Sequence, residues 1–381
     1  MEHTTCTGNC GSCSVRCYLN KNVPIVRDYI SLSLQAHEPR EGFGLAVDLG
    51  TTTVAMELID LQNGKTVAGY GFENPQRAFG SDVISRIQAA NEGQAVALRQ
   101  CICTAIIEHT SKLLRGRELA QAVISANTTM AYLLLGYECA CLGMVPFEPR
   151  TQLNNPYIWG GIFGGAGSCP VFVVPFISAY VGGDIVSGLL NVPRNNSFLL
   201  VDLGTNGEIA LGHAGKLYAT ATAAGPAFEG LKPGLCASDV LNTMAKLLRE
   251  ECIDETGYME NDECHGFTQR DVRHIQLAKS AVRSGIEILQ NIAGRPEIDT
   301  VYLCGGFGKS LDEQSALDIG LFPKSLHGKI IALGNSSLGG AVRLLKNPDA
   351  QHEIPAIVAA QHVNLSEQRS FNDYFMEHMG F

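Results

Sequence analysis

The same short segment occurs twice in this chain, and the repeat limits the folds that the sequence can adopt. Residues 45–55 read Leu-Ala-Val-Asp-Leu-Gly-Thr-Thr-Thr-Val-Ala, and residues 200–210 read Leu-Val-Asp-Leu-Gly-Thr-Asn-Gly-Glu-Ile-Ala. Each copy predicts an apolar strand, a tight D-L-G-T turn and a returning strand, with a Gly-Lys turn following at 64–65 and 215–216. Because the two hairpins lie a domain's length apart, we predict a duplicated α/β fold with two facing halves.

The rest of the chain fits such a fold. Its 381 residues are 45% hydrophobic and only 17% charged, which excludes a disordered chain and is enough for a large core. Short β-branched runs alternate with amphipathic helical patterns, the longest over 271–293, as is typical of α/β proteins. The predicted parts are a Cys-rich segment 1–20, a connector 21–42, a first half 43–192, a second half 193–347 and a C-terminal tail 348–381.

The balance of charges excludes some classes of partner. The chain carries 38 acidic and 28 basic residues, a net charge of −10, without a Lys/Arg-rich run, so no nucleic-acid partner is expected. No apolar run reaches the ~18 residues of a membrane-spanning helix, and no signal peptide is visible. Thirteen cysteines, an odd number with four close together, indicate metal or redox chemistry rather than a disulfide scaffold. We therefore expect a cytoplasmic protein from a reducing, anaerobic setting, with no membrane partner.

Four of the cysteines form one N-terminal cluster with the spacing C-x₃-C-x₂-C-x₃-C: Cys6, Cys10, Cys13 and Cys17. Soft thiolates at such short spacing suit an Fe–S cluster or zinc. The spacing is close to the bacterial ferredoxin run C-x₂-C-x₂-C-x₃-C, which favours a [4Fe–4S] cluster. Zinc and a redox-active or unliganded segment remain the alternatives.

The other cysteines are expected to be structural. Cys101 and Cys103 lie in a helical pattern and are predicted core residues, whereas Cys139 and Cys141 are close in a loop and are weaker candidates for ligands. Small buried hydrophobes are the expectation for the cysteines that are isolated in sequence, namely Cys169, Cys236, Cys252, Cys264 and Cys304. The ten histidines form no H-x-x-H or H-E-x-x-H pattern, so no His-based metal site is predicted.

The repeated hairpins point to a nucleotide. A D-L-G-T turn presents backbone N–H groups and hydroxyls to a phosphate, and its glycine allows a close approach. The Asp of such a turn holds Mg²⁺ directly or through water. A third glycine-rich turn, Gly305-Gly-Phe-Gly308, follows the predicted strand 300–303. Because the two matched hairpins occur together with this turn, the sequence predicts binding of ATP and Mg²⁺.

At this point the chain resembles the ASKHA superfamily, the fold of acetate kinase, sugar kinases, Hsp70 and actin, in which a nucleotide cleft lies between two halves. It is most similar to one branch, the ATP-dependent reductive activators of corrinoid proteins, over about residues 44–346. The motifs that carry this resemblance are Asn74-Pro-Gln76, Gly80-Ser-Asp-Val-Ile-Ser-Arg86, Asn127-Thr-Thr-Met130, Tyr180-Val-Gly-Gly-Asp184, Asp202-Leu-Gly-Thr-Asn-Gly-Glu208, Ala223-Ala-Gly-Pro-Ala-Phe-Glu-Gly230, Gln276-Leu-Ala-Lys279 and Gly305-Gly-Phe-Gly308.

The resemblance also assigns roles to residues. Asp48 and Asp202 are expected on Mg²⁺, and Asn127 and Asp184 complete the expected catalytic set, Asp184 by orienting water. A charge at a helix N-terminus is the alternative explanation of Asp184. Contacts to the phosphates, ribose or adenine are expected from the remaining candidates: Gly50, Thr51, Thr52, Thr53, Thr128, Gly204, Thr205, Asn206, Gly207, Glu208, Glu229, Lys279, Gly305, Gly306 and Phe307.

Two departures from the family pattern stand out. Family members usually carry fifty or more residues between Phe-Glu-Gly and a Gly-Ile-Cys-Gly-Ser-Gly segment. Here Gly230 is followed almost at once by Gly234-Leu-Cys-Ala-Ser-Asp239, so a subdomain is expected to be missing. The family also usually begins with a full [2Fe–2S] ferredoxin-like domain, in place of which this chain has the four-cysteine cluster.

The resemblance implies an ATPase that couples hydrolysis to electron transfer from its Fe–S cluster, returning a Co(II) corrinoid protein of a methyl-transfer system to Co(I). An external low-potential electron donor and a homodimer are expected with it. One alternative is an activator of a double-cubane or 2-hydroxyacyl-CoA dehydratase-type Fe–S protein. Two others are a small-molecule kinase and a zinc-binding, nucleotide-sensing scaffold.

Overall fold

The computed structural model describes residues 28–32, 37–204, 206–228, 231, 235, 237–305 and 312–381. The N-terminal cysteine cluster lies outside the described residues, as do Thr205, Glu229, Gly306 and Phe307. The chain divides into two compact units, each with its own hydrophobic core. Of the described residues, the N-terminal unit comprises those of Ser31–Pro193 and Ser336–Ala359, and the C-terminal unit comprises 28–30 and those of Arg194–Asn335 and Ala360–Phe381.

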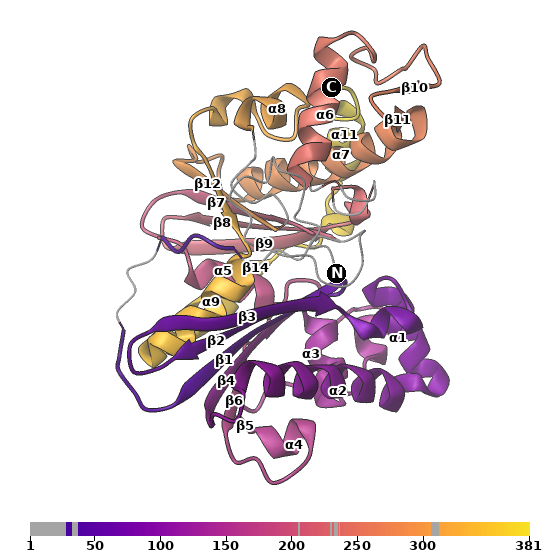
Figure 1. Ribbon diagram of the computed structural model, residues 1–381. Coiled ribbons are helices and arrows are strands. Elements are labelled where there is room, and N and C mark those ends of the chain that lie inside the picture. Colours follow the sequence, from indigo (N-terminus) through magenta and orange to yellow (C-terminus); the bar gives the residue numbers. More distant parts are fainter. Residues whose placement is uncertain are drawn as a thin grey trace. The chain divides into compact units, whose positions relative to one another are not determined.

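A six-stranded sheet of order β3-β2-β1-β4-β6-β5 forms the centre of the N-terminal unit (Figure 1). β1 pairs with β2 in antiparallel fashion and with β4 in parallel, so the first repeat becomes a hairpin at the middle of the sheet. Its central strands are apolar and almost wholly buried. The strands are β1 (Phe43–Leu49), β2 (Thr53–Asp60), β3 (Lys65–Glu73), β4 (Leu119–Ala126), β5 (Tyr157–Ile158) and β6 (Pro170–Val173).

Two helices of this unit begin at side chains that cap them. Asp82 forms a capping box with Ser85 at the start of α1, and the Asn127 side chain caps α3. The helical elements are η1 (Pro75–Phe79), α1 (Val83–Ala89), η2 (Ala90–Gln94), α2 (Ala95–Leu114), α3 (Thr128–Leu135), η3 (Ala140–Leu142), α4 (Trp159–Phe163), α5 (Gly183–Leu190), α9 (Ser336–Lys346), η7 (Pro348–Glu353) and α10 (Ile354–Val358).

The C-terminal unit repeats the hairpin-centred sheet, in the order β13-β12-β7-β8-β9-β14. Asp202 opposes Glu208 across this hairpin, and Asp48 opposes Ala55 across the first. Both predicted hairpins are therefore confirmed. The strands are β7 (Phe198–Leu203), β8 (Gly207–His213), β9 (Lys216–Thr222), β12 (Thr300–Gly305), β13 (Ile330–Gly334) and β14 (Gln361–His362), with a separate pair, β10 (Glu263–Cys264) and β11 (Phe267–Thr268).

The helical elements of this unit are η4 (Gly225–Ala227), α6 (Ala237–Arg249), α7 (Gln269–Ile292), α8 (Glu313–Asp318), η6 (Lys324–Leu326), η8 (Leu365–Glu367) and α11 (Phe371–Glu377). The predicted helix over 271–293 is confirmed as α7, which Thr268 caps with Asp271. In the described part of the chain, no helix has the length and apolarity to cross a bilayer.

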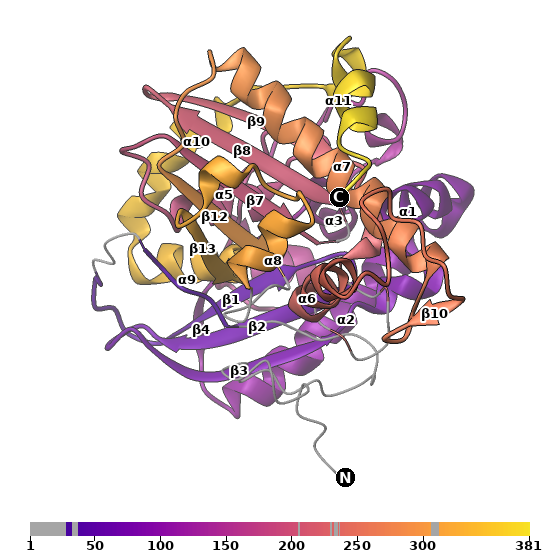
Figure 2. The same ribbon diagram turned by 90° about the horizontal axis from the view of Figure 1, so that it is seen from above.

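The two units are not the contiguous halves that the sequence suggested, because segments late in the chain are divided between them. Helix α9 is part of the N-terminal unit, because it packs against α5, β1 and β4. Within the predicted tail, β14 joins the C-terminal sheet beside β9, and α11 lies along α7 (Figures 1 and 2). The last 22 residues, Ala360–Phe381, are thus part of a folded unit.

Candidate nucleotide-binding site

The turn of the first hairpin, residues 50–52, is here called the phosphate turn. Its carbonyl oxygens accept hydrogen bonds from other residues of the protein. Asn74 donates from its side chain to the Gly50 carbonyl at 2.8 Å and from its backbone to the Thr52 carbonyl at 2.9 Å. Arg86 donates to the Thr51 carbonyl at 2.6 Å. A loop that binds phosphate through its N–H groups must turn its oxygens away from the anion. The three hydrogen bonds hold the loop in that orientation.

Arg86 places a positive charge next to this turn. Its side chain is fully buried and also donates to the Gly80 carbonyl at 3.0 Å and contacts Met130 Sδ at 3.1 Å. Burial lowers the pKa of Arg86 to about 10, which leaves the guanidinium charged at neutral pH. The residue therefore links the start of α1, helix α3 and the phosphate turn.

Replacing Arg86 by Gln is expected to destabilise the protein by about 3 kcal/mol, because two buried carbonyls lose their donor. Arg77→Gln is the matched control, since Arg77 lies nine residues earlier in a largely exposed i,i+4 pair with Glu73 and should change stability by no more than ~0.5 kcal/mol. Urea unfolding of both variants measures the difference. Equal stability of the two variants would refute the structural role of Arg86.

A chain of hydroxyl groups runs from Asp48 into the N-terminal unit. The Ser337 hydroxyl donates to Asp48 Oδ1 at 2.7 Å and lies 2.8 Å from Ser125 Oγ, which in turn lies 2.8 Å from Ser187 Oγ. Ser125 neighbours Asp48 in the β1–β4 register, whereas Ser337 comes from α9. A Cβ at Gly340 would overlap the Ser187 carbonyl, so glycine permits the close crossing of α9 and α5. The packing of α9 thus orients the Asp48 carboxylate.

Asp184 stands near Asp48 at the start of α5. A Cβ on Gly182 would lie 2.5 Å from the Asn127 Cα, so this glycine lets α5 begin against the end of β4. Burial raises the pKa of Asp184 to about 7, and the negative charge of Asp48 adds to this shift. The Ile185 N–H donates to the Asp184 carboxylate at 2.8 Å and opposes the shift. Two neighbouring carboxylates, one of them buried, form a donor set that suits a hard divalent cation such as Mg²⁺.

The raised pKa of Asp184 predicts a pH-dependent stability. A carboxyl whose folded-state pKa is raised stabilises the protein most at low pH, and this contribution is lost as the pH rises from about 4 through 7. Asp184→Asn removes the ionisation, so the variant should gain stability relative to wild type between pH 5 and pH 8. Urea unfolding at both pH values, with Asp349→Asn as an exposed control, checks this. A stability difference that does not change with pH would contradict it.

Asn127 and Thr128 are held by internal contacts. The Asn127 amide donates to Thr51 Oγ1 at 2.9 Å while its oxygen accepts from the Met130 N–H at 2.9 Å. Thr128 Oγ1 donates to the Ser178 carbonyl at 2.6 Å. Asn127 therefore lies against the phosphate turn, whereas the Thr128 hydroxyl is engaged within the protein.

In the C-terminal unit, the second hairpin lies against the end of β12. The Gly204 N–H donates to the Asn206 carbonyl at 3.0 Å, which closes the turn, and Cys304 pairs with Asp202 in the sheet. Gly305 has a φ of 90°, and a Cβ there would lie 2.6 Å from the Leu203 carbonyl and 3.0 Å from Asp202 Oδ1. Only glycine fits this approach. The structure thus brings the start of the third predicted loop to Asp202.

Comparison with known proteins agrees with this arrangement. The sequence model of the RACo middle region matches residues 43–194, and the model of the C-terminal domain of RACo, the ASKHA domain, matches residues 196–233 and 259–381. The chain belongs to the RACo family. The predicted family and the ASKHA-type α/β fold are both confirmed.

RACo-family relatives are similar over most of this chain. Corrinoid activation enzyme RamQ of Eubacterium limosum is 29% identical, over 88% of this chain and 69% of RamQ. The [Co(II) methylated amine-specific corrinoid protein] reductase of Methanosarcina barkeri is 22% identical, over 88% of this chain and 76% of that protein. A solved reductive activator for corrinoid, iron–sulfur protein has 29% identity and a TM-score of 0.80, over 90% of this chain and 67% of that one.

One residue predicted to contact the nucleotide, Lys279, contacts C-terminal residues in this RACo-family structure. Lys279 is buried on α7, donates to the Gly380 carbonyl and lies 5.1 Å from the centre of the Phe381 ring. Burial lowers the pKa of Lys279 to about 8, and nearby Arg283 acts in the same direction. Its ammonium group therefore binds the C-terminal residues in this conformation, and its contact with adenine or ribose stays a prediction.

Several residues that shape the site had no role assigned from the sequence. Asn74 and Arg86 were noted only as family motifs, and Ser125, Ser187 and Ser337 not at all. A polar residue directly after an apolar run is the one local signal that could have marked Ser125. Nothing local marks Ser337, which lies 289 residues from Asp48.

Proposed function

We propose that this protein is an ATP-dependent reductive activator of a corrinoid protein. Hydrolysis of ATP would drive one electron from an Fe–S cluster onto a Co(II) corrinoid, giving Co(I). The observation that carries the proposal is the RACo-family match over both units, with an Asp-bearing phosphate hairpin kept in each. The named activities of the relatives support the corrinoid protein as acceptor.

The nucleotide chemistry follows from the residues of the two hairpins. Asp48 and Asp202 would hold Mg²⁺, which offsets the phosphate charge when bound, and the turns at 50–52 and 204–206 would bind phosphate oxygens. Asp184 would orient the attacking water and, with a pKa near 7, accept its proton above neutral pH. The hydroxyl chain through Ser337 would keep Asp48 in place during turnover.

Electron transfer would use the four N-terminal cysteines as cluster ligands. Their thiolate chemistry and ferredoxin-like spacing support a [4Fe–4S] cluster. An external low-potential protein would reload the cluster, and ATP would act by shifting the population of complexes in which the acceptor is reducible. This chemistry needs a reducing compartment, so we propose a cytoplasmic protein that acts as a homodimer. Six cysteines of the described part are free thiols, which fits such a compartment.

Anaerobic purification with an activity assay tests this proposal. The expected result is a brown protein that contains iron and hydrolyses Mg-ATP faster when a Co(II) corrinoid protein is added. The matched variant Cys169→Ser should keep its iron, because Cys169 is distant in sequence from the cluster. A protein without iron whose ATPase does not respond to the corrinoid protein would refute the proposal. If only a double-cubane Fe–S protein stimulates the ATPase, that protein would take the place of the corrinoid protein as the electron acceptor.

A further inference from the structure

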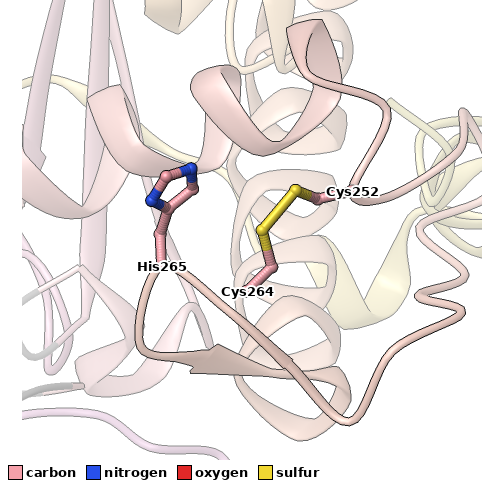
Figure 3. A group of neighbouring side chains, drawn as sticks. All are labelled: Cys252, Cys264 and His265. Atoms are coloured by element: carbon pink, nitrogen blue, oxygen red, sulfur yellow. A yellow bond between two sulfur atoms is a disulfide. The ribbon is translucent and has the colours of Figure 1, made fainter.

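A second group of metal-binding side chains lies in the C-terminal unit, apart from the nucleotide hairpins. Cys252 follows the end of α6, and Cys264 and His265 belong to the β10–β11 hairpin (Figure 3). One ligand atom from each of the three residues lies within 4.8 Å of the others. The prediction that Cys252 and Cys264 are isolated buried hydrophobes is therefore wrong, because the fold brings them together as a disulfide and leaves both partly exposed.

The backbone on both sides fixes the position of these residues. The Cys252 N–H donates to the Leu247 carbonyl at 2.9 Å, and Ile253 bridges to Met259. The two residues of the β10–β11 turn, His265 and Gly266, have φ values of 49° and 80°, as a tight type I′ hairpin requires. Cys264 is thus paired with the buried Phe267. The backbone thus holds the three side chains close together before an ion binds.

The charge around the site favours a cation. Residues 250–265 contain seven Asp and Glu and no Lys or Arg. The nearest of these carboxylates, Glu250, has Oε2 at 2.5 Å from His265 Nε2. A carboxylate beside a histidine is the usual support of a metal-bound imidazole.

We propose that Cys252, Cys264 and His265 bind one Zn²⁺ when the two cysteines are reduced, with Glu250 holding the His265 imidazole through its hydrogen bond. Two thiolates and an imidazole are a preferred ligand set of zinc. Reduction of the disulfide by a thiol reductant adds two electrons and two protons and gives two thiols. Zinc then displaces these two protons as the thiolates bind it. In either state the end of α6 stays tied to the β10–β11 hairpin.

The family match does not assign this site. The RACo C-terminal model matches 196–233 and 259–381, so Cys252 lies in the unmatched stretch 234–258. A metal that closes the loop between Cys252 and Cys264 would stabilise a segment that has few large apolar side chains of its own.

The test uses the full chain with the four N-terminal cysteines replaced by Ser, which removes the predicted N-terminal thiolate cluster. The protein is reduced with dithiothreitol without oxygen, loaded with Zn²⁺ and desalted, and zinc is counted by mass spectrometry. We expect about one zinc per chain. Loading with Co²⁺ instead should give thiolate-to-cobalt charge transfer and the intense visible bands of a tetrahedral ion.

Matched variants make the result specific. Cys252→Ser or Cys264→Ser should reduce zinc to near zero, and Cys169→Ser, a partly exposed thiol of the other unit, should keep it. His265→Asn should weaken binding at least 10-fold, and it keeps the fold because Asn tolerates the positive φ. Glu250→Gln should weaken binding up to about 100-fold.

Circular dichroism confirms that each variant is folded. The proposal is overturned if the reduced parent binds no more zinc than Cys252→Ser. It is equally overturned if His265→Asn binds zinc as tightly as the parent, or if the cobalt spectrum lacks the thiolate band. None of these results depends on ATP turnover or on the corrinoid protein, so the proposed function can fail independently.

Discussion

Replacing either Asp48 or Asp202 by Asn is expected to lower ATP turnover by about 100-fold or more. Each residue ends the first strand of a phosphate hairpin, and Asp48 is oriented by the Ser337 hydroxyl at 2.7 Å. Asn keeps the shape of the side chain but loses the charge that we propose holds Mg²⁺. Loss of a metal contact or an electrostatic clamp at a phosphoryl-transfer centre commonly costs this much.

The measurement is the steady-state ATPase rate, with circular dichroism to show that the variants fold. Asp299→Asn is the matched control for Asp202, because it precedes the neighbouring strand β12 at the other end of the same sheet and is exposed. It should retain the wild-type rate. Wild-type turnover in both Asp48→Asn and Asp202→Asn would mean that the two hairpins do not form the ATP site.

Removing residues 1–20 is expected to abolish electron transfer and leave nucleotide binding intact. The segment has too few large apolar residues to form a core of its own, and a connector with Pro24 and Pro39 follows it. The truncated chain should lose its iron and its activity toward the corrinoid protein. A thermal shift with Mg-ATP should stay as large as in the full chain, and failure to fold or to bind nucleotide would make the segment structural.

Single substitutions examine the same cluster more finely. If all four thiolates bind one cluster, replacing any one of Cys6, Cys10, Cys13 or Cys17 by Ser should lower iron per chain and change the electron paramagnetic resonance signal. Cys101→Ser, in helix α2, is the control. Unchanged iron and spectrum in Cys17→Ser alone would favour a C-x₃-C-x₂-C triplet with an external fourth ligand.

The central strands and the longest helix could be predicted from sequence because their signals are local. The two copies of D-L-G-T lie between apolar runs, and both became antiparallel hairpins at the middle of a sheet. The apolar stripe of 271–293 matches α7, Gln269–Ile292, to within two residues at each end. Period and turn chemistry decide such elements without knowledge of the rest of the chain.

Other features depend on contacts between distant residues. Helix α9 belongs with the strands of the N-terminal unit, because Gly340 admits the Ser187 carbonyl and Ser337 reaches Asp48. Arg86 carries no local sign of burial, yet it is buried and donates to the Thr51 carbonyl of the first turn. Cys252 and Cys264 meet only because a hairpin folds back on the end of α6. Local patterns do not encode these pairings.

The most direct test of the account follows the cobalt of a corrinoid protein during ATP hydrolysis. The anaerobic protein, reduced by a low-potential donor, is mixed with a Co(II) corrinoid protein and Mg-ATP, and the Co(II) electron paramagnetic resonance signal and the Co(I) absorption are recorded together. The account predicts that Co(II) is converted to Co(I) only with hydrolysable ATP, and not by Asp48→Asn or by the chain without residues 1–20. Equal conversion without ATP, or hydrolysis that leaves the Co(II) signal unchanged, would contradict it.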